Sequence, residues 1–287
     1  MKRISICVVF AILSCCAVSA AQDAKLKLKF TTIMVKNATN TRIYGVNNKG
    51  AMVGQYYDSQ NVPHGLLLVG KKVTTLDDPN GSTSFCIAIN SKGVIVGDYI
   101  NNSGVQTGFI YSGGKFKDLA PSGALSTTPN GINDKGVVIG VYTDSSGLVH
   151  GFTWNGKNFN SFDAPGASST TGYGINNKGL MTVQWADSTG NTESSLYDGK
   201  KFKTINVPGA VSSYAHGIDT AGDVVYSWTD SGGLFHGALR MGSKVYKFDD
   251  PKGTDGTYGD GINDKRLIVG VIHTNGGGTA EGFKATY

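Results

Sequence analysis

The hexapeptide Gly131-Ile132-Asn133-Asp134-Lys135-Gly136 decides the fold of this chain, because versions of it recur along the sequence. The other five copies are Gly45-Val46-Asn47-Asn48-Lys49-Gly50, Ala88-Ile89-Asn90-Ser91-Lys92-Gly93, Gly174-Ile175-Asn176-Asn177-Lys178-Gly179, Gly217-Ile218-Asp219-Thr220-Ala221-Gly222 and Gly261-Ile262-Asn263-Asp264-Lys265-Arg266. From Asn47 onward, successive copies are 43, 43, 43, 43 and 44 residues apart. Self-similarity at a fixed period of this length is the signature of a repeat architecture. The sequence therefore predicts six copies of one structural unit.

Each copy reads as four short strands. The first strand ends at Gly-Ile-Asn, and the following Asn-x-Lys-Gly is a tight turn with glycine where a positive φ is needed. In the last copy Arg266 takes this glycine position, so the same turn would hold Arg266 at a positive φ. An apolar second strand such as 137–140 follows, then a polar hairpin such as 144–147 and a third strand at 151–154. Asn155-Gly156 is a strong two-residue turn into a fourth strand, and four strands in about 40 residues is the spacing of a β-propeller blade.

The composition agrees with an all-β protein. Glycine accounts for 41 of the 287 residues, and charged residues account for 16%, below the usual ~25%. Glu193 and Glu281 are the only glutamates, and a chain poor in Glu but rich in Gly, Thr, Ser, Asn and Tyr does not favour helices. The chain lacks a Gly-X-Y period and contains many Val, Ile, Phe and Tyr, so it is neither collagen-like nor disordered.

The two ends of the chain distinguish a closed ring from a stacked solenoid. The last repeat stops at 283–287, which reads as a third strand without a fourth, and 28–33 resembles the fourth strands at 73–76 and 202–205. A ring explains this pattern, because the N-terminal strand then completes the last blade and removes the exposed edges, whereas a solenoid would need atypical caps. We therefore predict a six-bladed β-propeller with four antiparallel strands per blade. The small residues before Ile-Asn would suit innermost strands, where blades crowd together. They are Gly45, Ala88, Gly131, Gly174, Gly217 and Gly261.

Residues 1–21 have the pattern of a secretory signal peptide. Lys2 and Arg3 form a positive n-region, 4–18 is an apolar run without charge, and Ser19-Ala20-Ala21 offers a cleavage site. The apolar run is short for a bilayer span, and no later segment is apolar enough to form one. We therefore expect an extracellular or periplasmic protein in which 22–287 forms a single propeller domain.

Cysteine usage depends on that cleavage. A lipid anchor at Cys15 is the alternative to simple secretion. Removal of the leader takes away Cys7, Cys15 and Cys16 and leaves Cys86, so no internal disulfide can form. Cys86 stands in an apolar stretch, where we interpret it as a small buried filler.

The repeat resembles the HAF repeat, an extracellular repeat family named for a His-Ala-Phe motif. The motif stands here as His64-Gly65-Leu66, His150-Gly151-Phe152 and His236-Gly237-Ala238, and the Gly-Ile-Asn and Pro-Gly-Ala elements are similar too. The resemblance covers the chain from about residue 28 to 287 and implies a secreted, mostly bacterial repeat protein. It implies no activity and no catalytic residues. The fourth copy departs from the pattern, because Glu193-Ser194-Ser195 replaces its His motif.

Three columns of aligned polar residues have structural interpretations. The first column is His64, Thr107, His150, Glu193, His236 and Glu281; we expect each His to hold a hairpin through an Asp or the backbone, because different blades cannot share one metal ion. The second is Asp58, Asn101, Asp144, Asp187, Asp230 and Thr274, where Asp and Asn start turns by bonding their own backbone. The third is Lys49, Lys92, Lys135, Lys178 and Lys265 in exposed turns, solvated or, alternatively, a basic ring for an anionic polymer.

The residues that enter the first strand of each blade form the candidate site. They should line the mouth of a central funnel, and they vary while their neighbours repeat. The outer column is Arg42, Phe85, Thr128, Thr171, Tyr214 and Tyr258, and the inner column is Tyr44, Ile87, Asn130, Tyr173, His216 and Asp260. Aromatic side chains beside hydrogen-bonding groups suit sugars and other amphipathic ligands, although packing between blades is the alternative use of Tyr and Phe here. The predicted ligand-binding residues are Arg42, Tyr44, Phe85, Tyr173, Tyr214, His216, Tyr258 and Asp260.

These observations favour a non-catalytic binding or scaffold module whose ligand is a glycan, an envelope component or a protein partner at the funnel. The alternative is a hydrolase or lyase acting on polysaccharide, with His216 and Asp260 from adjacent blades as acid/base partners and Arg42 as an anion clamp. A purely structural surface repeat is a third alternative. The chain has no Gly-x-Ser-x-Gly, His-Glu-x-x-His or phosphate-loop motif, and we predict no cofactor or metal.

Charge gives no sign of a nucleic-acid partner. The formal net charge of +5 falls to +3 without Lys2 and Arg3, and the basic residues are spread along the sequence without a cluster. We expect a monomer without a membrane span.

Overall fold

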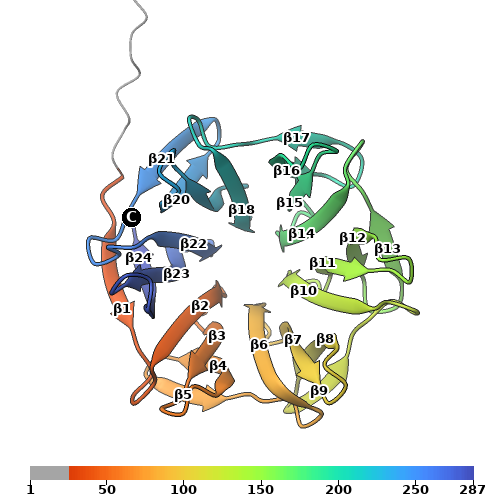
Figure 1. Ribbon diagram of the computed structural model, residues 1–287, viewed down its shortest axis with the longest axis horizontal. Coiled ribbons are helices and arrows are strands. Elements are labelled where there is room, and N and C mark those ends of the chain that lie inside the picture. Colours follow the sequence, from red (N-terminus) through yellow and green to blue (C-terminus); the bar gives the residue numbers. More distant parts are fainter. Residues whose placement is uncertain (1–25) are drawn as a thin grey trace, which may run out of the picture.

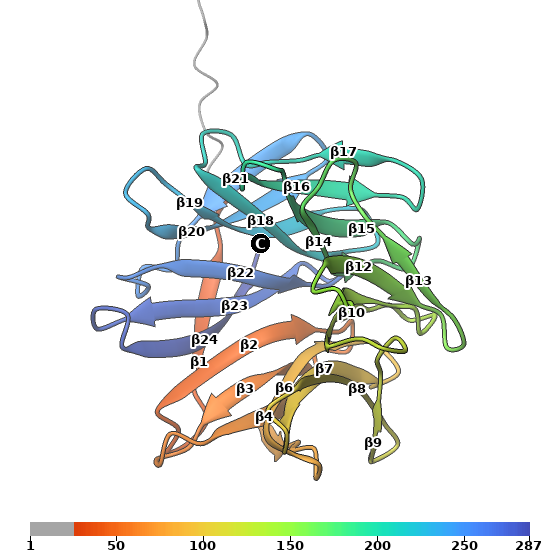
Figure 2. The ribbon, with the colours of Figure 1, turned by 45° about the vertical axis from the view of Figure 1, so that its right-hand side comes forward.

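Six four-stranded antiparallel blades stand around a central axis in the computed structural model, which describes residues 26–287 (Figures 1 and 2). One parallel pairing, Val149 opposite Ser169, joins blades 3 and 4 into a single sheet. Blade 1 contains β2 (Asn40–Val46), β3 (Met52–Tyr57), β4 (Pro63–Val69) and β5 (Lys72–Thr75). Blade 2 contains β6 (Gly81–Ile89), β7 (Ile95–Asn101), β8 (Gln106–Ser112) and β9 (Lys115–Asp118). Blade 3 contains β10 (Ser126–Ile132), β11 (Val138–Thr143), β12 (Val149–Trp154) and β13 (Phe159–Phe162).

The second half of the ring repeats this arrangement. Blade 4 contains β14 (Ser169–Ile175), β15 (Met181–Ala186), β16 (Thr192–Tyr197) and β17 (Phe202–Thr204). Blade 5 contains β18 (Ser212–Ile218), β19 (Val224–Thr229), β20 (Phe235–Met241) and β21 (Lys244–Phe248). Blade 6 contains β22 (Thr257–Ile262), β23 (Leu267–Thr274), β24 (Thr279–Thr286) and β1 (Lys29–Ile33). The predicted all-β, six-bladed propeller is confirmed.

The N-terminal strand closes the ring as predicted. β1 pairs antiparallel with β24, from Lys29 opposite Thr286 to Ile33 opposite Gly282, and Figure 1 shows the two ends of the described chain side by side in this blade. The Phe30 ring packs 5.5 Å from the Phe283 ring in an edge-on arrangement. The outer edge of β24 is therefore covered by a strand from the other end of the chain.

The predicted signal peptide, its cleavage site and the alternative anchor at Cys15 lie outside the described residues. Among residues 26–287, no helix has the length and apolar character that a bilayer span requires.

Each sheet is a meander, which gives the ring two different faces. The turns between first and second strands and between third and fourth strands lie at one end, here called the turn face. The hairpins between second and third strands and the connections between blades lie at the other end, here called the mouth face. Every first strand lies innermost, around the axis (Figure 1).

The innermost strands are as crowded as the small residues predict. A Cβ atom on Gly131 would lie 2.4 Å from the carbonyl oxygen of Tyr173 in the next blade. At Gly261 it would lie 2.8 Å from the carbonyl oxygen of Tyr44, across the junction of the last and first blades. Real Cβ atoms do not approach backbone this closely, so a larger residue would push neighbouring blades apart.

The hydrophobic core lies between adjacent blades. The cluster between blades 1 and 2 joins Val53 and Leu76 to Cys86, Ile95 and Phe109, and four of these five side chains are fully buried. Cys86 is a free thiol in this cluster, which confirms its interpretation as a small apolar filler. Because every blade packs on two neighbours, closing the ring buries the apolar faces of the first and last blades as well.

A ring of asparagines ties the blades together on the turn face. In five blades the Asn of Gly-Ile-Asn donates from Nδ2 to the backbone oxygen of its counterpart in the next blade, at 2.8–3.1 Å. The donors are Asn47, Asn90, Asn133, Asn176 and Asn263. Asp219 stands at the sixth position, where a carboxylate has no amide hydrogens to donate.

The last copy keeps the shape of the turn despite its arginine. Arg266 has φ of 60°, as the sequence predicts, whereas Gly50 and its counterparts have φ between 80° and 94° at this position. The Arg266 guanidinium lies 5.7 Å from the centre of the Tyr287 ring. A cation–π contact therefore accompanies the strained backbone.

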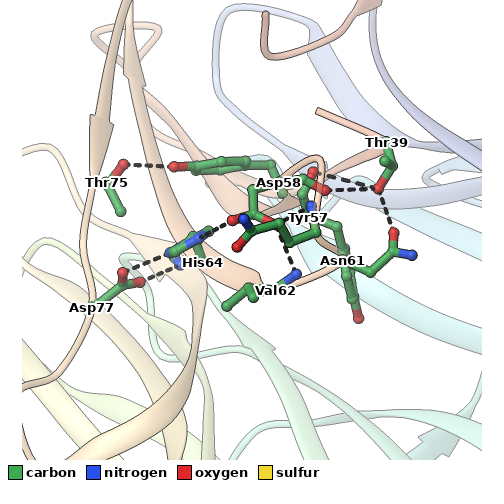
Figure 3. A network of polar contacts seen from close by, with 11 residues as sticks. Thr39, Tyr57, Asp58, Asn61, Val62, His64, Thr75 and Asp77 are labelled. Atoms are coloured by element: carbon green, nitrogen blue, oxygen red, sulfur yellow. Dashed lines mark hydrogen bonds and ion pairs between the residues drawn. The ribbon is translucent and has the colours of Figure 1, made fainter. Parts of the chain in front are cut away.

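The histidines of the first polar column hold the loops of the mouth face through hydrogen bonds to aspartates, as predicted. His64 Nδ1 lies 2.7 Å from Asp77 Oδ2, in the connection to blade 2, and His64 Nε2 lies 3.5 Å from Asp58 Oδ2 (Figure 3). The Asp58 carboxylate also accepts hydrogen bonds from the backbone of Gln60 and Val62 in its own turn. His150 and His236 are held in the same way, each between an Asp thirteen residues later and an Asp six residues earlier. In blade 4, Asn206 Nδ2 donates to Glu193 Oε2 at 2.6 Å, and this hydrogen bond takes the place of the His–Asp contact.

Candidate functional site

A β-bulge in every blade aims one side chain at the axis. The register between first and second strands shifts just before the Gly-Ile-Asn, for example between Ile43 and Gly45 in blade 1 and between Gly259 and Gly261 in blade 6. In each blade the inner-column residue is left without a partner at the shift, and in blades 4 and 5 the glycine that follows it is unpaired too. A bulge bends its strand and redirects a side chain. The inner column therefore points into the channel because the chain carries one extra residue there.

These side chains surround a cavity of about 430 Å³. The whole inner column lines it, together with the outer-column residues Phe85 and Thr128. The outer-column residues Arg42, Thr171, Tyr214 and Tyr258 do not line it. The volume falls in the ordinary range of small-molecule sites.

An aliphatic ring forms the floor of the cavity. The residue before the ring asparagine is Val or Ile in every blade, and each is 7–8% exposed. They are Val46, Ile89, Ile132, Ile175, Ile218 and Ile262, and they line both the large cavity and a hollow of about 70 Å³ on the turn face. The cavity thus has a polar and aromatic wall above an apolar floor.

Three polar side chains in the wall have their polar atoms free of intramolecular hydrogen bonds in the part of the chain that the structure describes. They are Tyr173, His216 and Asp260, and each keeps part of its surface open. The rings of Tyr173 and His216 are arranged edge to face, with their centres 5.0 Å apart. Tyr44 also lines the wall, but its hydroxyl interacts with the Arg42 side chain. The first three groups are available to a ligand.

Burial disfavours the charged forms of these groups. It lowers the pKa of His216 to about 4 and raises the pKa of Tyr173 to about 12. Burial also raises the pKa of Asp260 well above its ordinary value, and the positive charge of Arg42 opposes that rise. At neutral pH the imidazole is therefore neutral, and removing a proton from Asp260 is costly.

His216 and Asp260 come from adjacent blades and line one cavity, but no hydrogen bond or ion pair between described residues joins them. Arg42 and Asp260 likewise form no ion pair within 4.0 Å in residues 26–287. The Nε atom of Arg42 is buried without a hydrogen-bond partner in this part of the chain. No hydrogen bond or ion pair between described residues therefore links the three residues of the catalytic alternative, which are His216, Asp260 and Arg42.

One carboxyl group in the wall escaped the sequence analysis. Asp98 lies on the second strand of blade 2, opposite Phe85, and it accepts hydrogen bonds from Gln106 Nε2 and, at 3.1 Å, from Thr128 Oγ1. Burial raises the pKa of Asp98 to about 6, against the hydrogen bonds from Gln106 and Thr128. Its aligned positions vary from blade to blade, so the criterion that identified the first-strand columns would have found it. They are Gln55, Val141, Gln184, Ser227 and Val271.

The outer column forms an aromatic rim on blades 5 and 6. Tyr214 lies 5.9 Å from Phe235, Phe235 stacks on Tyr258 at 4.5 Å, and Tyr258 lies 5.0 Å from His273. Phe235 and His273 belong to neighbouring strands and were not predicted. Tyr214 and Tyr258 both pack against Phe235, and Tyr258 also packs against His273. These contacts favour packing between blades over direct ligand binding as the use of the two tyrosines.

Comparison with solved structures identifies similar folds. Virginiamycin B lyase from Staphylococcus aureus, solved in a catalytically inactive form with quinupristin, is 13% identical, with a TM-score of 0.54 over 91% of this chain and 100% of that one. The Aleuria aurantia lectin, solved with α-methyl-L-fucoside, is 12% identical, with a TM-score of 0.55 over 88% and 93%. The propeller domain of the trilobed protease from Pyrococcus furiosus is 12% identical, with a TM-score of 0.54 over 87% and 82%.

At these identities the likeness extends to the fold alone. The sequence matches no family model and no curated protein sequence.

Proposed function

We propose that this propeller binds a neutral, hydroxyl-rich ligand, a glycan end or short oligosaccharide, in the channel at its mouth face and does not transform it. The observation that carries the proposal is the set of free polar atoms on Tyr173, His216 and Asp260 in a cavity of about 430 Å³. Because these side chains are partly open to the channel, a ligand that enters it can form hydrogen bonds with them.

Most of the wall suits an uncharged ligand, and Asp98, with a pKa of about 6, disfavours an anion. His216 is neutral at physiological pH, and the Asp260 carboxyl and the Tyr173 hydroxyl favour their protonated forms. These groups offer both donors and acceptors, while Phe85 and the aliphatic floor offer apolar surface. A sugar presents hydroxyl groups around its edge and C–H groups on its faces, so it matches both kinds of surface.

Two further observations support a secreted glycan-binding role. The N-terminal pattern of charge, apolar run and small residues favours export, and the resemblance to the HAF repeat implies an extracellular protein. The Aleuria aurantia lectin, which shares the fold, was solved with a fucoside.

A glycan array with the mature chain, 22–287, identifies candidate sugars, and calorimetry then measures their affinity. We expect Tyr173→Ala to weaken binding at least about tenfold, equivalent to ~1.4 kcal/mol. Thr171→Ala is the matched control, because Thr171 lies two residues away on the same strand and outside the cavity. Binding that is equally affected by both variants, or binding of proteins but of no sugar, would refute the proposal.

A polysaccharide hydrolase or lyase is the second candidate, and the carboxyl groups of the cavity favour it. Burial raises the pKa of Asp98 to about 6 and raises that of Asp260 well above its ordinary value, so both hold a proton more readily than an ordinary aspartate, which suits a general acid. Screening the protein for polysaccharide cleavage, and repeating the assay with Asp260→Asn, separates the two functions. Cleavage that Asp260→Asn abolishes while binding persists would establish the enzyme.

A further inference from the structure

The fold gathers basic residues that are scattered along the sequence. Five of the six copies have a lysine two residues after the Asn of Gly-Ile-Asn. In blades 1–5 a lysine also stands in or beside the turn between the third and fourth strands. Both kinds of turn lie on the turn face. The basic residues there, all of them exposed, are Lys49, Lys71, Lys72, Lys92, Lys115, Lys135, Lys157, Lys178, Lys200, Lys201, Lys244, Lys265 and Arg266.

Acidic residues on the turn face are fewer and are mostly bound to the protein. The carboxylates on these turns are Asp134, Asp198, Asp219, Asp223 and Asp264. The side chain of Asp134 accepts hydrogen bonds from the Ser91 backbone and from Asn177, and Asp264 accepts them from Thr220 and Asn48. Asp198 accepts hydrogen bonds from the backbone of two residues in its own turn. The turns of this face therefore carry thirteen basic residues against five aspartates.

The mouth face carries the opposite charge. Its loops hold Asp58, Asp77, Asp118, Asp144, Asp163, Asp187, Asp230, Asp249 and Asp255, against the cations Lys36 and Lys252 and the pinned histidines. The modest net charge of the chain thus conceals two faces of opposite sign. A polyanion approaching this molecule is attracted to one face and repelled from the other.

We propose that the turn face binds an anionic polysaccharide and that this contact leaves the channel mouth facing away from the polymer. The two sets of turns place lysines in an inner and an outer circle, so a flexible chain finds cations along any path across the face. Lysine is a compact point charge without the planar fork that selects one geometry. Charge spacing rather than a fixed sequence of groups is what such a surface recognises.

Two other polyanions fit the face less well. Membrane attachment needs a second signal besides basic charge, such as inserted apolar side chains. Of the exposed large apolar residues in 26–287, only Val69 and Val73 lie beside the turn face, and the other seven lie on loops of the mouth face. Nucleic-acid readout relies heavily on arginine, whereas Arg266 is the one arginine among the basic residues on these turns.

The test measures binding of the mature chain to immobilised heparin and polygalacturonate at increasing salt, with neutral dextran as a blank. We expect binding to both polyanions that falls steeply between about 50 and 200 mM salt. The variant Lys92→Gln/Lys135→Gln/Lys178→Gln should bind at least about tenfold more weakly, with a salt slope reduced by up to about three. The control Lys36→Gln/Lys203→Gln/Lys252→Gln removes the same charge from the mouth face and an outer strand, and should bind like the unchanged protein.

Several results would overturn the proposal. They are equal losses in the two triple variants, no binding to either polyanion at about 50 mM salt, and tighter binding to anionic vesicles or duplex DNA than to the polysaccharides at equal charge. Thermal unfolding of each variant verifies that it is folded, because exposed substitutions change stability by about 0.5 kcal/mol or less. Tyr173→Ala tests independence from the channel, since it should leave binding of the polyanions unchanged whether or not the channel binds a sugar.

Discussion

Asp219→Asn should stabilise the protein, because it supplies the missing member of the asparagine ring. Asp219 Oδ1 accepts hydrogen bonds from the backbone of Gly222 and Asp223, as Asn133 Oδ1 does from Lys135 and Val137 in its own turn. The second carboxylate oxygen therefore takes the place of the amide that donates to the next blade elsewhere. An asparagine keeps both turn bonds and adds an Nδ2 donor for the backbone oxygen of Asn263.

The magnitude follows from one added hydrogen bond. A typical net contribution is about 1 kcal/mol, which corresponds to a rise of about 2 °C in Tm for a domain of this size. Burial and the charge of Asp264 raise the pKa of Asp219. A group with a raised folded pKa stabilises the fold when protonated and loses that contribution as the pH rises. The gain from Asp219→Asn should therefore be largest at pH 7 and shrink as the pH falls towards about 4.

Urea unfolding of the mature chain at several pH values measures this effect. Asn133→Asp is the matched control, because it creates the same gap in another blade and should cost about 1–3 kcal/mol. A lower free energy of unfolding for Asp219→Asn at pH 7, or a gain that does not depend on pH, would refute the reasoning.

Three further predictions concern the ring and its loops. Arg266→Gly relieves about 1 kcal/mol of backbone strain but loses the contact with Tyr287 and loosens the unfolded chain, so the free energy of unfolding should stay within about 0.5 kcal/mol of its original value; a gain approaching about 1 kcal/mol would show that the contact contributes nothing. Deleting 22–36 removes β1 and should cost roughly 3 kcal/mol or more in urea unfolding, the cost of losing a packed Phe alone; unchanged unfolding would contradict the closure of the ring. The hydrogen bond that His150 donates to Asp163 raises the pKa of His150, so His150→Gln should destabilise the protein more at about pH 5 than at about pH 9, where the histidine is neutral and its contribution is lost; an equal loss at both pH values would exclude the charged pair.

Closure of the ring was predictable because it leaves a mark at both ends of the sequence. The strand at 28–33 matches fourth strands elsewhere, and 283–287 lacks one, so the strand order of the last blade follows from the pattern alone. The contact between His64 and Asp58 and the turn that Asp58 stabilises were also predictable, because both form within a single repeat.

The candidate site was predictable only in part. The inner column was found because it varies, but its direction depends on a one-residue bulge that no residue type announces. Asp98 reaches the cavity from a second strand, and Gln106 reaches it from a third, so their proximity to Thr128 of the next blade depends on the packing of two sheets. Neither position is adjacent in sequence to a residue of the inner or outer column.

The sequence by itself determined the number of blades, the four-strand pattern, the tight turns and the strand that closes the ring, because each depends on local backbone preferences repeated at a constant spacing. The tertiary structure alone decided which side chains share a space. Lys49 and Lys178 stand 129 residues apart in the chain but lie on one face of the ring, and Tyr173 and His216, 43 residues apart, meet at 5.0 Å. The physical reason is that a closed ring turns each repeated position into a circle around one axis, so small local choices add up to a cavity on one face and a charged surface on the other.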